Sequence, residues 1–280
     1  MYHSVSENGR QDGLTVDADQ LEQHFRYLWA NNYKTLLLSD LIACHEQKQP
    51  LPEKAVLITF DDGFRNNYQL AYPLAKKYQV KLNFFLVPAF IKRGTYGELS
   101  CLSVEDLLKM DPAIVEYGLH SLEHQSYDIL KPIDIETDIY NCMSAFEDLG
   151  IPWQPCLAYP YGAWPRKVLQ ESRFFEILEE QGIRLAFRIG NRLNRFPFQN
   201  RFLIQRLDIR GDESFHTFRL SLAYGKKSTS WLAPLLRALN QRHPLANHAP
   251  SPATPVTNRR PPGPVLNNSS TFEVNNPSKD

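Results

Sequence analysis

The feature that most constrains the fold is a set of short, almost wholly apolar segments that recur along the chain. The first, residues 55–60, reads AVLITF and is rich in β-branched side chains. A run of this kind, without polar alternation, is typical of a strand buried on both faces. We predict further strands at Tyr33–Leu38, Leu82–Val87, Ile114–Leu119, Cys156–Tyr159 and Arg184–Ile189.

Helical patterns separate these runs. The first is capped by Asp17 or Asp19, and its apolar face is Leu21, Phe25, Leu28 and Trp29. We predict further helices near Asn67–Tyr78, over Ser103–Met110, through Ile135, Ile139, Met143 and Phe146 to Gly150, and over Lys167–Gln181. Strands that alternate with helices indicate a mainly parallel sheet, and right-handed crossovers favour a (β/α) barrel.

Composition excludes several classes of protein. The 280 residues carry 31 basic and 31 acidic side chains, so the net charge is zero and bulk electrostatic attraction to nucleic acid is not expected. No run of about 18 apolar residues is present, so we predict no transmembrane segment. The four cysteines are far apart, and we interpret them as buried free thiols.

The chain divides unequally. We predict one folded domain over residues 1–225, a helical continuation over 226–243, and a disordered tail over 244–280 that holds 8 of the 20 prolines. The first residues contain no basic start and apolar run of a secretory leader. The chain as printed is therefore predicted to be cytoplasmic, whereas a longer N-terminus would allow the cell envelope. The oligomeric state is not predicted.

Two adjacent carboxylates, Asp61 and Asp62, follow the 55–60 run, and Gly63 comes directly after them. Functional groups of parallel α/β sheets gather at the carboxyl ends of the strands. Two carboxylates at such a place are costly to desolvate unless a cation meets them, which favours a metal or catalytic site. Asp-Asp-Gly is also ordinary turn chemistry, and this alternative stays open.

His120 and His124 follow the strand predicted at Ile114–Leu119. Histidines four residues apart face the same way on a helical turn, and together with an aspartate they would form a three-ligand site with an open position for a catalytic metal. The pair alone is a weak signal, because solvated or capping histidines show the same spacing.

A third cluster, Ala158-Tyr159-Pro160-Tyr161-Gly162, follows the strand predicted at Cys156–Tyr159. It contains no strong metal ligand. Proline and glycine define a loop that could aim a backbone N–H at a developing oxyanion. An aromatic turn at the exit of a strand is the alternative.

The order and spacing of these three clusters resemble the polysaccharide deacetylase family, also called carbohydrate esterase family 4 or the NodB-homology domain. Tyr2-His3-Ser4-Val5, residues 21–38 and residues 182–189 resemble its bacterial branch, so the likeness covers about residues 1–225. The resemblance implies an α/β fold, a distorted and incomplete (β/α) barrel of mostly parallel strands. It also implies one divalent metal ion, commonly zinc, and an N-acetylated glycan or sugar as substrate.

The resemblance also implies roles for individual residues. Asp62, His120 and His124 would hold the metal, and Asp61 would be the general base. The backbone N–H of Tyr161 would help to hold the oxyanion, and Thr59 would support the loop.

The sequence departs from the family pattern in places. Ala158 replaces the arginine that orients the base in many members, and Arg206 is a candidate substitute from a later strand. The late histidine that supplies the acid is absent, and His216 is a weak replacement. His3 is expected to lie near the site as a supporting or substrate-contacting residue.

These observations leave three functional hypotheses. The first is a metal-dependent hydrolase that removes N-acetyl groups from a sugar or polysaccharide. The second is a catalytically impaired member of the family that binds a glycan or a protein. The third is an esterase or amidase that acts on another acyl substrate.

Overall fold

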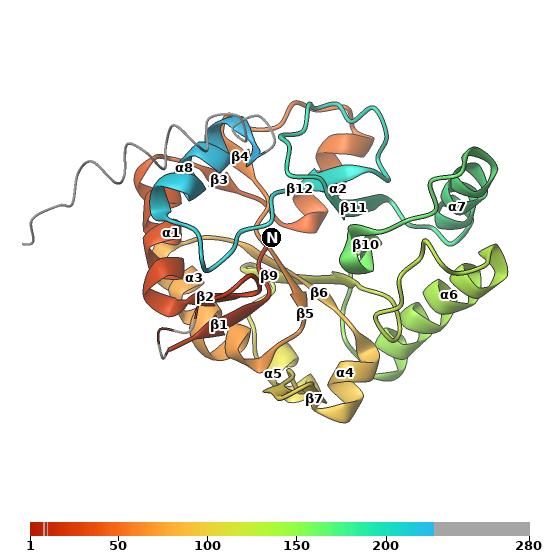
Figure 1. The fold of residues 1–280 in the computed structure, drawn as a ribbon, viewed down its shortest axis with the longest axis horizontal. Helices are drawn as coiled ribbons and strands as arrows, with labels where there is room; N and C mark the ends of the chain where they lie inside the picture. Colours follow the sequence, from red (N-terminus) through yellow and green to blue (C-terminus); the bar gives the residue numbers. More distant parts are fainter. Residues whose placement is uncertain (8, 10, 227–280) are drawn as a thin grey trace, which may run out of the picture. The chain divides into compact units, whose positions relative to one another are not determined.

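The structure is a computed structural model that describes residues 1–7, 9 and 11–226. Its centre is a six-stranded sheet with the order β12-β11-β10-β9-β6-β5, in which every neighbouring pair is parallel. The strands are β5 (Thr59–Asp62), β6 (Leu82–Leu86), β9 (Val115–Leu119), β10 (Cys156–Ala158), β11 (Leu185–Ile189) and β12 (Ile204–Arg206). The sheet curls into a half-barrel with helices around it (Figure 1). The predicted parallel α/β barrel is therefore confirmed.

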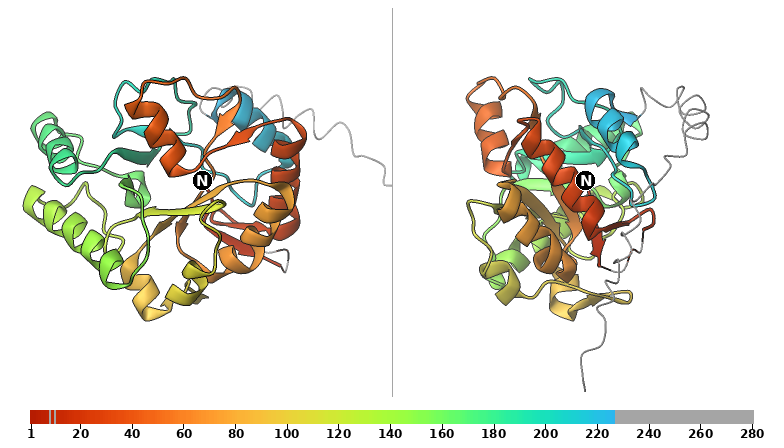
Figure 2. Two further views of the ribbon diagram at one scale, coloured as in Figure 1. Left: turned by 180° about the vertical axis from the view of Figure 1, so that it is seen from behind. Right: turned by 90° about the vertical axis from the view of Figure 1, so that its left-hand side faces the viewer.

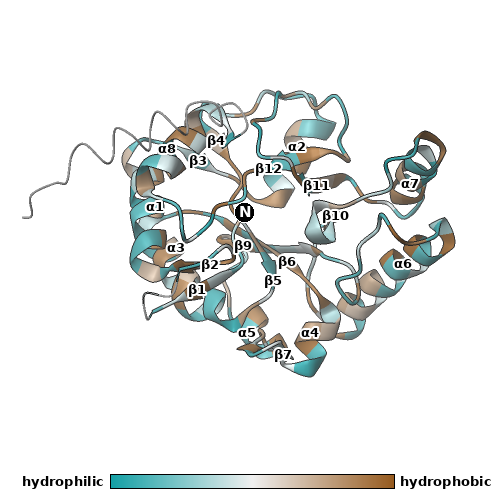
Figure 3. Cartoon of the chain, in the orientation of Figure 1, coloured by the Kyte–Doolittle hydropathy of each residue, from teal (hydrophilic) through white to brown (hydrophobic). Residues whose placement is uncertain are grey.

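Ten helical segments accompany the sheet in the described part of the chain. They are α1 (Ala18–Ala30), α2 (Leu38–Glu46), the π-helical η1 (Asn67–Ala71), α3 (Tyr72–Tyr78), α4 (Pro88–Arg93), α5 (Val104–Leu108), α6 (Pro132–Asp148), the 3₁₀ turn η2 (Pro160–Gly162), α7 (Val168–Glu180) and α8 (Phe215–Tyr224). The longer helices carry both hydrophobic and hydrophilic stretches, as amphipathic helices over a sheet should (Figure 3). None is long and apolar enough to cross a membrane.

Three small two-stranded sheets complete the described elements. They pair β1 (Ser4–Ser6) with β2 (Thr15–Asp17), β3 (Lys34–Thr35) with β4 (Ala55–Val56), and β7 (Thr95–Tyr96) with β8 (Leu99–Ser100). The first two pairs are parallel and the third is antiparallel. Figure 2 shows the same elements from behind and from the side.

Two predicted strands are shorter than expected. The 55–60 run is not one strand, because its first two residues pair with β3 and β5 starts only at Thr59. The 33–38 segment contains only β3, and α2 then begins at Leu38. That helix was not predicted; the Asp40 carboxylate accepts the Leu37 N–H at 2.9 Å and stabilises its first turn.

Helix α1 confirms the predicted cap but corrects its buried face. Asp17 is the N-cap, and its side chain accepts the Asp19 N–H at 3.0 Å. Trp29 is 57% exposed, so its assignment to the apolar face was wrong. The buried stripe instead runs from Leu21 toward His24, because residue 24 lies on the inner side of the helix and residue 29 lies at its edge.

The N-terminal segment lies in the gap between the two edge strands of the half-barrel. The Tyr2 N–H donates to the Thr59 carbonyl at 2.8 Å, and the Asp61 N–H donates to the Tyr2 carbonyl at 3.0 Å. The Ile209 N–H, beyond β12, donates to the Met1 carbonyl at 3.0 Å. Backbone hydrogen bonds therefore join both edges through this segment.

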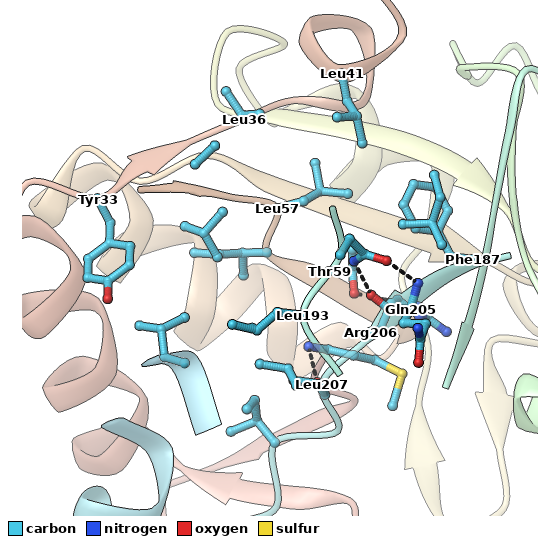
Figure 4. Close-up of a pocket in the computed structure, with 18 of the residues that line it drawn as sticks. Tyr33, Leu36, Leu41, Leu57, Thr59, Phe187, Leu193, Gln205, Arg206 and Leu207 are labelled. Atoms are coloured by element: carbon cyan, nitrogen blue, oxygen red, sulfur yellow. Dashed lines mark hydrogen bonds between the residues drawn. The ribbon is translucent and has the colours of Figure 1, made fainter. Parts of the chain in front are cut away.

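A mostly apolar cavity of about 460 Å³ lies between the edge strands. Tyr33, Leu36, Leu57 and Leu193 are among the side chains that line it (Figure 4). Of the candidate site residues, only Thr59 and Arg206 reach it. The cavity therefore adjoins the back of the site and does not contain the acidic and histidine cluster.

The four cysteines are free thiols, as predicted, and three of them are buried. The helical continuation predicted over 226–243 falls outside the described residues except at residue 226. The disordered tail predicted over 244–280 falls wholly outside them.

Candidate functional site

Asp61 and Asp62 are the last two residues of β5, and both are buried. The prediction placed them after the strand, whereas β5 in fact ends at Asp62. The chain then leaves the sheet sharply, with φ of 71° at Asp62 and 80° at Gly63. A Cβ at Gly63 would also lie 3.0 Å from the Leu86 side chain, so glycine suits both the conformation and the space.

Arg206, at the end of β12, binds Asp61 with two hydrogen bonds. Its Nη1 donates to Asp61 Oδ1 at 2.6 Å and its Nη2 donates to Oδ2 at 2.7 Å. Nη1 also lies 3.4 Å from the Thr59 hydroxyl oxygen, which links Thr59 to the same arrangement. Arg206 and Asp61 are both buried, so the pair is little screened by solvent.

Ala158 stands at the position where the sequence departs from the family pattern by lacking an arginine. It is a buried residue of β10. The Arg206 guanidinium reaches Asp61 from the opposite edge of the half-barrel. The charge is therefore supplied by a residue that lies 145 positions away from Asp61 in the chain.

The His120 ring is oriented by a backbone carbonyl. Its Nδ1 lies 2.8 Å from the Ala158 carbonyl oxygen, which can only accept, so Nδ1 carries the proton. The Nε2 lone pair then faces Asp62, whose Oδ1 lies 3.6 Å away. Such a carbonyl partner fixes the tautomer that a metal-binding histidine requires.

His124 approaches the same oxygen from the other side. Its Nε2 lies 3.4 Å from Asp62 Oδ1, and its Nδ1 lies 3.1 Å from the Tyr161 hydroxyl. The sequence suggested a role only for the backbone of Tyr161. The structure adds a side-chain contact that helps to orient His124.

Asp62, His120 and His124 form a three-residue group that fits a metal ion. One ligand atom of each lies within 4.8 Å of the others. Asp62 Oδ1 is buried and has no hydrogen-bond partner in the described part of the chain. Ligand atoms at about 2.1 Å from a tetrahedral ion are separated by about 3.4 Å, close to the observed contacts. An ion would therefore satisfy this buried and otherwise unpaired oxygen.

The pKa values of the two aspartates are shifted in opposite directions. Burial alone would raise the pKa of Asp61, but the Arg206 guanidinium holds it well below its usual range. Burial and the neighbouring Asp61 charge raise the pKa of Asp62 to about 8. Asp61 is thus stable as an anion without further help, whereas Asp62 requires a cation to ionise at neutral pH.

Both histidines are uncharged at neutral pH, as metal-binding imidazoles must be. Burial lowers the pKa of His120 to about 3 and that of His124 to about 4. Their lone pairs are therefore available throughout the neutral range, as metal binding requires.

The loop of Tyr161 has the conformation of a tight turn, with φ of 58° at Tyr161. Within the described residues, the backbone hydrogen bonds of this loop come from the N–H groups of Gly162 and Ala163 rather than from Tyr161. The Tyr161 side chain is 63% exposed beside His124, with ring centroids 4.6 Å apart. Its ring therefore lies beside His124 and is open to solvent.

The structure brings His3 to the site but leaves His216 away from it. His3 follows Tyr2, whose carbonyl binds the Asp61 N–H. Burial lowers the pKa of His3, and the Asp61 charge opposes that effect, which places the two groups within electrostatic reach. His216 is exposed on α8 and has no contact with the three site clusters among the described residues.

Two further residues lie near the three-residue group. Tyr96, on β7, stacks on Phe90 at 4.0 Å and lies 6.0 Å from His124 between ring centroids; the aromatic content of this loop suits sugar stacking and loop packing equally. Sequence reasoning missed the second residue. Asp138, on α6, binds the loop that carries the histidines. The sequence did contain a signal for Asp138, because it follows Ile135 by three residues and therefore lies on the same buried face of the helix.

The chain is similar to known proteins in sequence and in fold. Residues 48–185 match the model of the polysaccharide deacetylase family. The segment of residues 48–185 belongs to this family. YxkH of Bacillus subtilis, named provisionally as a polysaccharide deacetylase, is 29% identical over 172 residues. That match covers 61% of this chain and 59%, less than two thirds, of YxkH.

A second relative of the deacetylase family is the poly-β-1,6-N-acetyl-D-glucosamine N-deacetylase of Staphylococcus aureus. It is 23% identical over 214 residues, which are 73% of this chain and 71% of the relative.

Solved structures show the same fold. The Streptococcus pyogenes deacetylase PplD in complex with acetate has a TM-score of 0.67 at 17% identity, and the match covers 79% of this chain and 96% of PplD. IcaB from Ammonifex degensii has a TM-score of 0.65 at 22% identity, with 79% and 93% covered.

Proposed function

We propose that the protein is a metal-dependent hydrolase that removes N-acetyl groups from an N-acetylated polysaccharide. The observation that carries the proposal is the convergence of Asp62, His120 and His124 on one unpaired carboxylate oxygen, beside an ionised Asp61. Family membership and the name of the staphylococcal relative support the choice of an N-acetylated glycan.

Zinc is the ion we propose, because two neutral imidazoles and one carboxylate form a donor set that zinc favours. When bound, it would polarise the acetamide carbonyl and lower the pKa of a water molecule. His120, oriented by the Ala158 carbonyl, and His124, oriented by the Tyr161 hydroxyl, would hold it together with Asp62. Three protein ligands leave room for water and substrate.

Asp61 is the proposed general base. It is ionised, buried and aimed by Arg206, so it can accept a proton as water attacks the acetamide carbon. Because Arg206 keeps its pKa low, protonated Asp61 is a strong acid. It can therefore pass the proton to the nitrogen as the C–N bond breaks, which gives acetate and a free amine. This removes the need for a separate late histidine, and His3 would contact the departing amine.

Tyr161 is the proposed oxyanion donor. Its backbone N–H belongs to a loop held by the N–H groups of Gly162 and Ala163, and this N–H would donate to the carbonyl oxygen as negative charge develops. The ring centroids of Tyr96 and the exposed Tyr161 lie 6.0 Å and 4.6 Å from that of His124, and both rings would contact the sugar.

The test is an acetate-release assay on poly-β-1,6-N-acetyl-D-glucosamine and chitin oligomers with zinc-loaded protein. Asp61→Asn should lose at least about 100-fold in rate, the scale of a general base, while it keeps stoichiometric zinc. His120→Ala should lose zinc and activity together. His216→Ala, on the exposed face of α8, is the control and should behave as the wild type.

The outcomes separate the three hypotheses. Stoichiometric zinc without acetate release from any glycan would favour the impaired binding protein, although the Arg206–Asp61 pair argues against it. Faster release from O-acetyl than from N-acetyl substrates would favour the esterase. Zinc binding and turnover that survive in His120→Ala would overturn the proposed site.

A further inference from the structure

The loop that carries the two histidines has a costly backbone conformation. Ser121 has φ of 65° and His124 has φ of 62°, in the left-handed region that residues other than glycine rarely occupy. Such conformations persist where the surroundings over-determine them. Something outside the loop must therefore hold it in the shape that brings both Nε2 atoms to Asp62.

Asp138 of α6 makes contacts that can do so. Its Oδ1 accepts the Ser121 hydroxyl at 3.0 Å and the Leu122 N–H at 3.1 Å. Its Oδ2 accepts the Tyr127 hydroxyl at 2.7 Å. The Ser121 hydroxyl oxygen in turn accepts the Gln125 N–H at 3.0 Å. These bonds hold the chain on both sides of His124.

Asp138 is itself well anchored. It is 9% exposed, and Ile135 and Ile139 on the same helix are buried in the core. Loss of its carboxylate would leave two hydroxyls and one backbone N–H without their acceptor in a buried place. The bonds from α6 to Ser121 and Leu122 would then be lost, and with them the side-chain support of the left-handed residues that Asp138 supplies.

We infer that Asp138 is a positioning residue that presets His120 and His124 for metal binding by holding the Ser121–Gln125 backbone. It does not contact either imidazole in the described structure, so it acts through the loop. The inference rests on the proposed metal-dependent function. Partners of this kind behind metal ligands typically contribute 10–100-fold to metal affinity.

The experiment is a Co²⁺ titration of the metal-free full chain, followed by the visible absorption spectrum of the bound ion. Asp138→Ala should bind Co²⁺ about 10–100-fold more weakly and with an altered spectrum. Asp138→Asn keeps an acceptor for Ser121 and Leu122, so it should restore most of the affinity and the wild-type spectrum. Tyr127→Phe, which removes only the bond to Oδ2, should have the smallest effect.

The matched control is Asp40→Ala. Asp40 also accepts a backbone N–H, but it caps α2 and pairs with Lys81, which directly precedes β6, at the end of the sheet opposite the site. It should lower thermal stability without changing Co²⁺ affinity. If Asp138→Ala does not fold, Ser121→Ala tests the same link, because alanine occupies the space but removes the hydroxyl; its affinity should fall several-fold.

Two results separate the inference from the proposed function. Wild-type affinity and spectrum in folded Asp138→Ala, or in Ser121→Ala where the former does not fold, would overturn the positioning role and leave the hydrolase intact. A wild-type protein that binds no Co²⁺ would overturn the proposed function and this inference with it.

Discussion

Asp61 and Asp62 are neighbours in the chain, yet their surroundings give them different chemistry. Arg206 holds the first as an anion, while burial beside that anion raises the pKa of the second to about 8. Two adjacent carboxylates would otherwise repel each other in a place with little water. One arginine therefore divides the pair into an ionised carboxylate, the proposed base, and a carboxyl group that a bound cation would ionise.

Arg206→Met tests this division. Without the guanidinium, the pKa of Asp61 rises, because burial alone raises it. The base then becomes protonated at a higher pH than before. We expect the acidic limb of the profile of kcat/KM against pH to move to higher pH. We also expect kcat/KM at neutral pH to fall roughly 100-fold, because Asp61 is no longer oriented.

Arg206→Lys is the companion variant, since it keeps the charge but not the two parallel bonds. In Arg206→Lys the pKa of Asp61 should rise less than in Arg206→Met, but the rate of acetate release should still fall. Arg210→Met, which removes an exposed arginine paired with Asp212, is the control. An unchanged pH profile in Arg206→Met would contradict the assigned role.

At the scale of elements, a buried histidine joins α1 to α8. The His24 ring stacks on Phe218 with centroids 3.9 Å apart, and its Nδ1 lies 3.1 Å from the Tyr2 hydroxyl. His24 is 1% exposed, and its Nε2 has no hydrogen-bond partner among the described residues. Burial lowers its pKa to about 3, so the imidazole is neutral in the folded protein.

This histidine should make the fold sensitive to acid. Its pKa is lower in the folded than in the unfolded chain, so its favourable contribution is present above about pH 6.5 and is lost as the pH falls toward 3. Between pH 7 and pH 5 the loss is about 2 kcal/mol in the free energy of unfolding. Urea unfolding of wild type and His24→Phe at both pH values measures it.

Between pH 7 and pH 5, the free energy of unfolding of the wild type should fall by about 2 kcal/mol relative to that of His24→Phe. Tyr2→Phe keeps the imidazole and should keep the wild-type pH dependence. Equal slopes of stability against pH in wild type and His24→Phe would show that His24 does not titrate as described.

At the scale of the whole described domain, the site joins strands that are distant in sequence. Asp62 ends β5, and His120 follows β9, with β6 between them in the sheet. The segment that carries His3 and the strand that carries Arg206 contribute from the two edges of the half-barrel. Occupation of the site would therefore oppose the opening of several elements at once.

Metal removal tests that linkage. A ligand that binds only the folded state at 1,000 times its Kd contributes about 4 kcal/mol. For a domain of this size, that corresponds to a fall in Tm on the order of 10 °C when a chelator removes the ion. Asp62→Ala should show no response to the chelator. A wild-type Tm that is insensitive to both zinc and chelator would argue against a tightly bound ion.

Local patterns were sufficient for much of the fold. Residues close together in the chain determine the apolar runs at β6, β9 and β11. The same is true of the helix caps at Asp17 and Ser103. They failed where tertiary packing overrides local preference. Trp29 lies outside the buried face, and the 55–60 run divides between two sheets because its first residues pair with β3.

By itself, the sequence determined which side chains leave the carboxyl ends of the parallel strands, and hence that Asp61, Asp62, His120 and His124 could meet. Only the tertiary structure decided what surrounds them. Arg206 reaches Asp61 across 145 positions, and Asp138 reaches the histidine loop from the buried face of a helix. The physical reason is that strands and caps are set by neighbours in the chain, whereas a buried charge is set by whichever groups the closed sheet brings within hydrogen-bond reach.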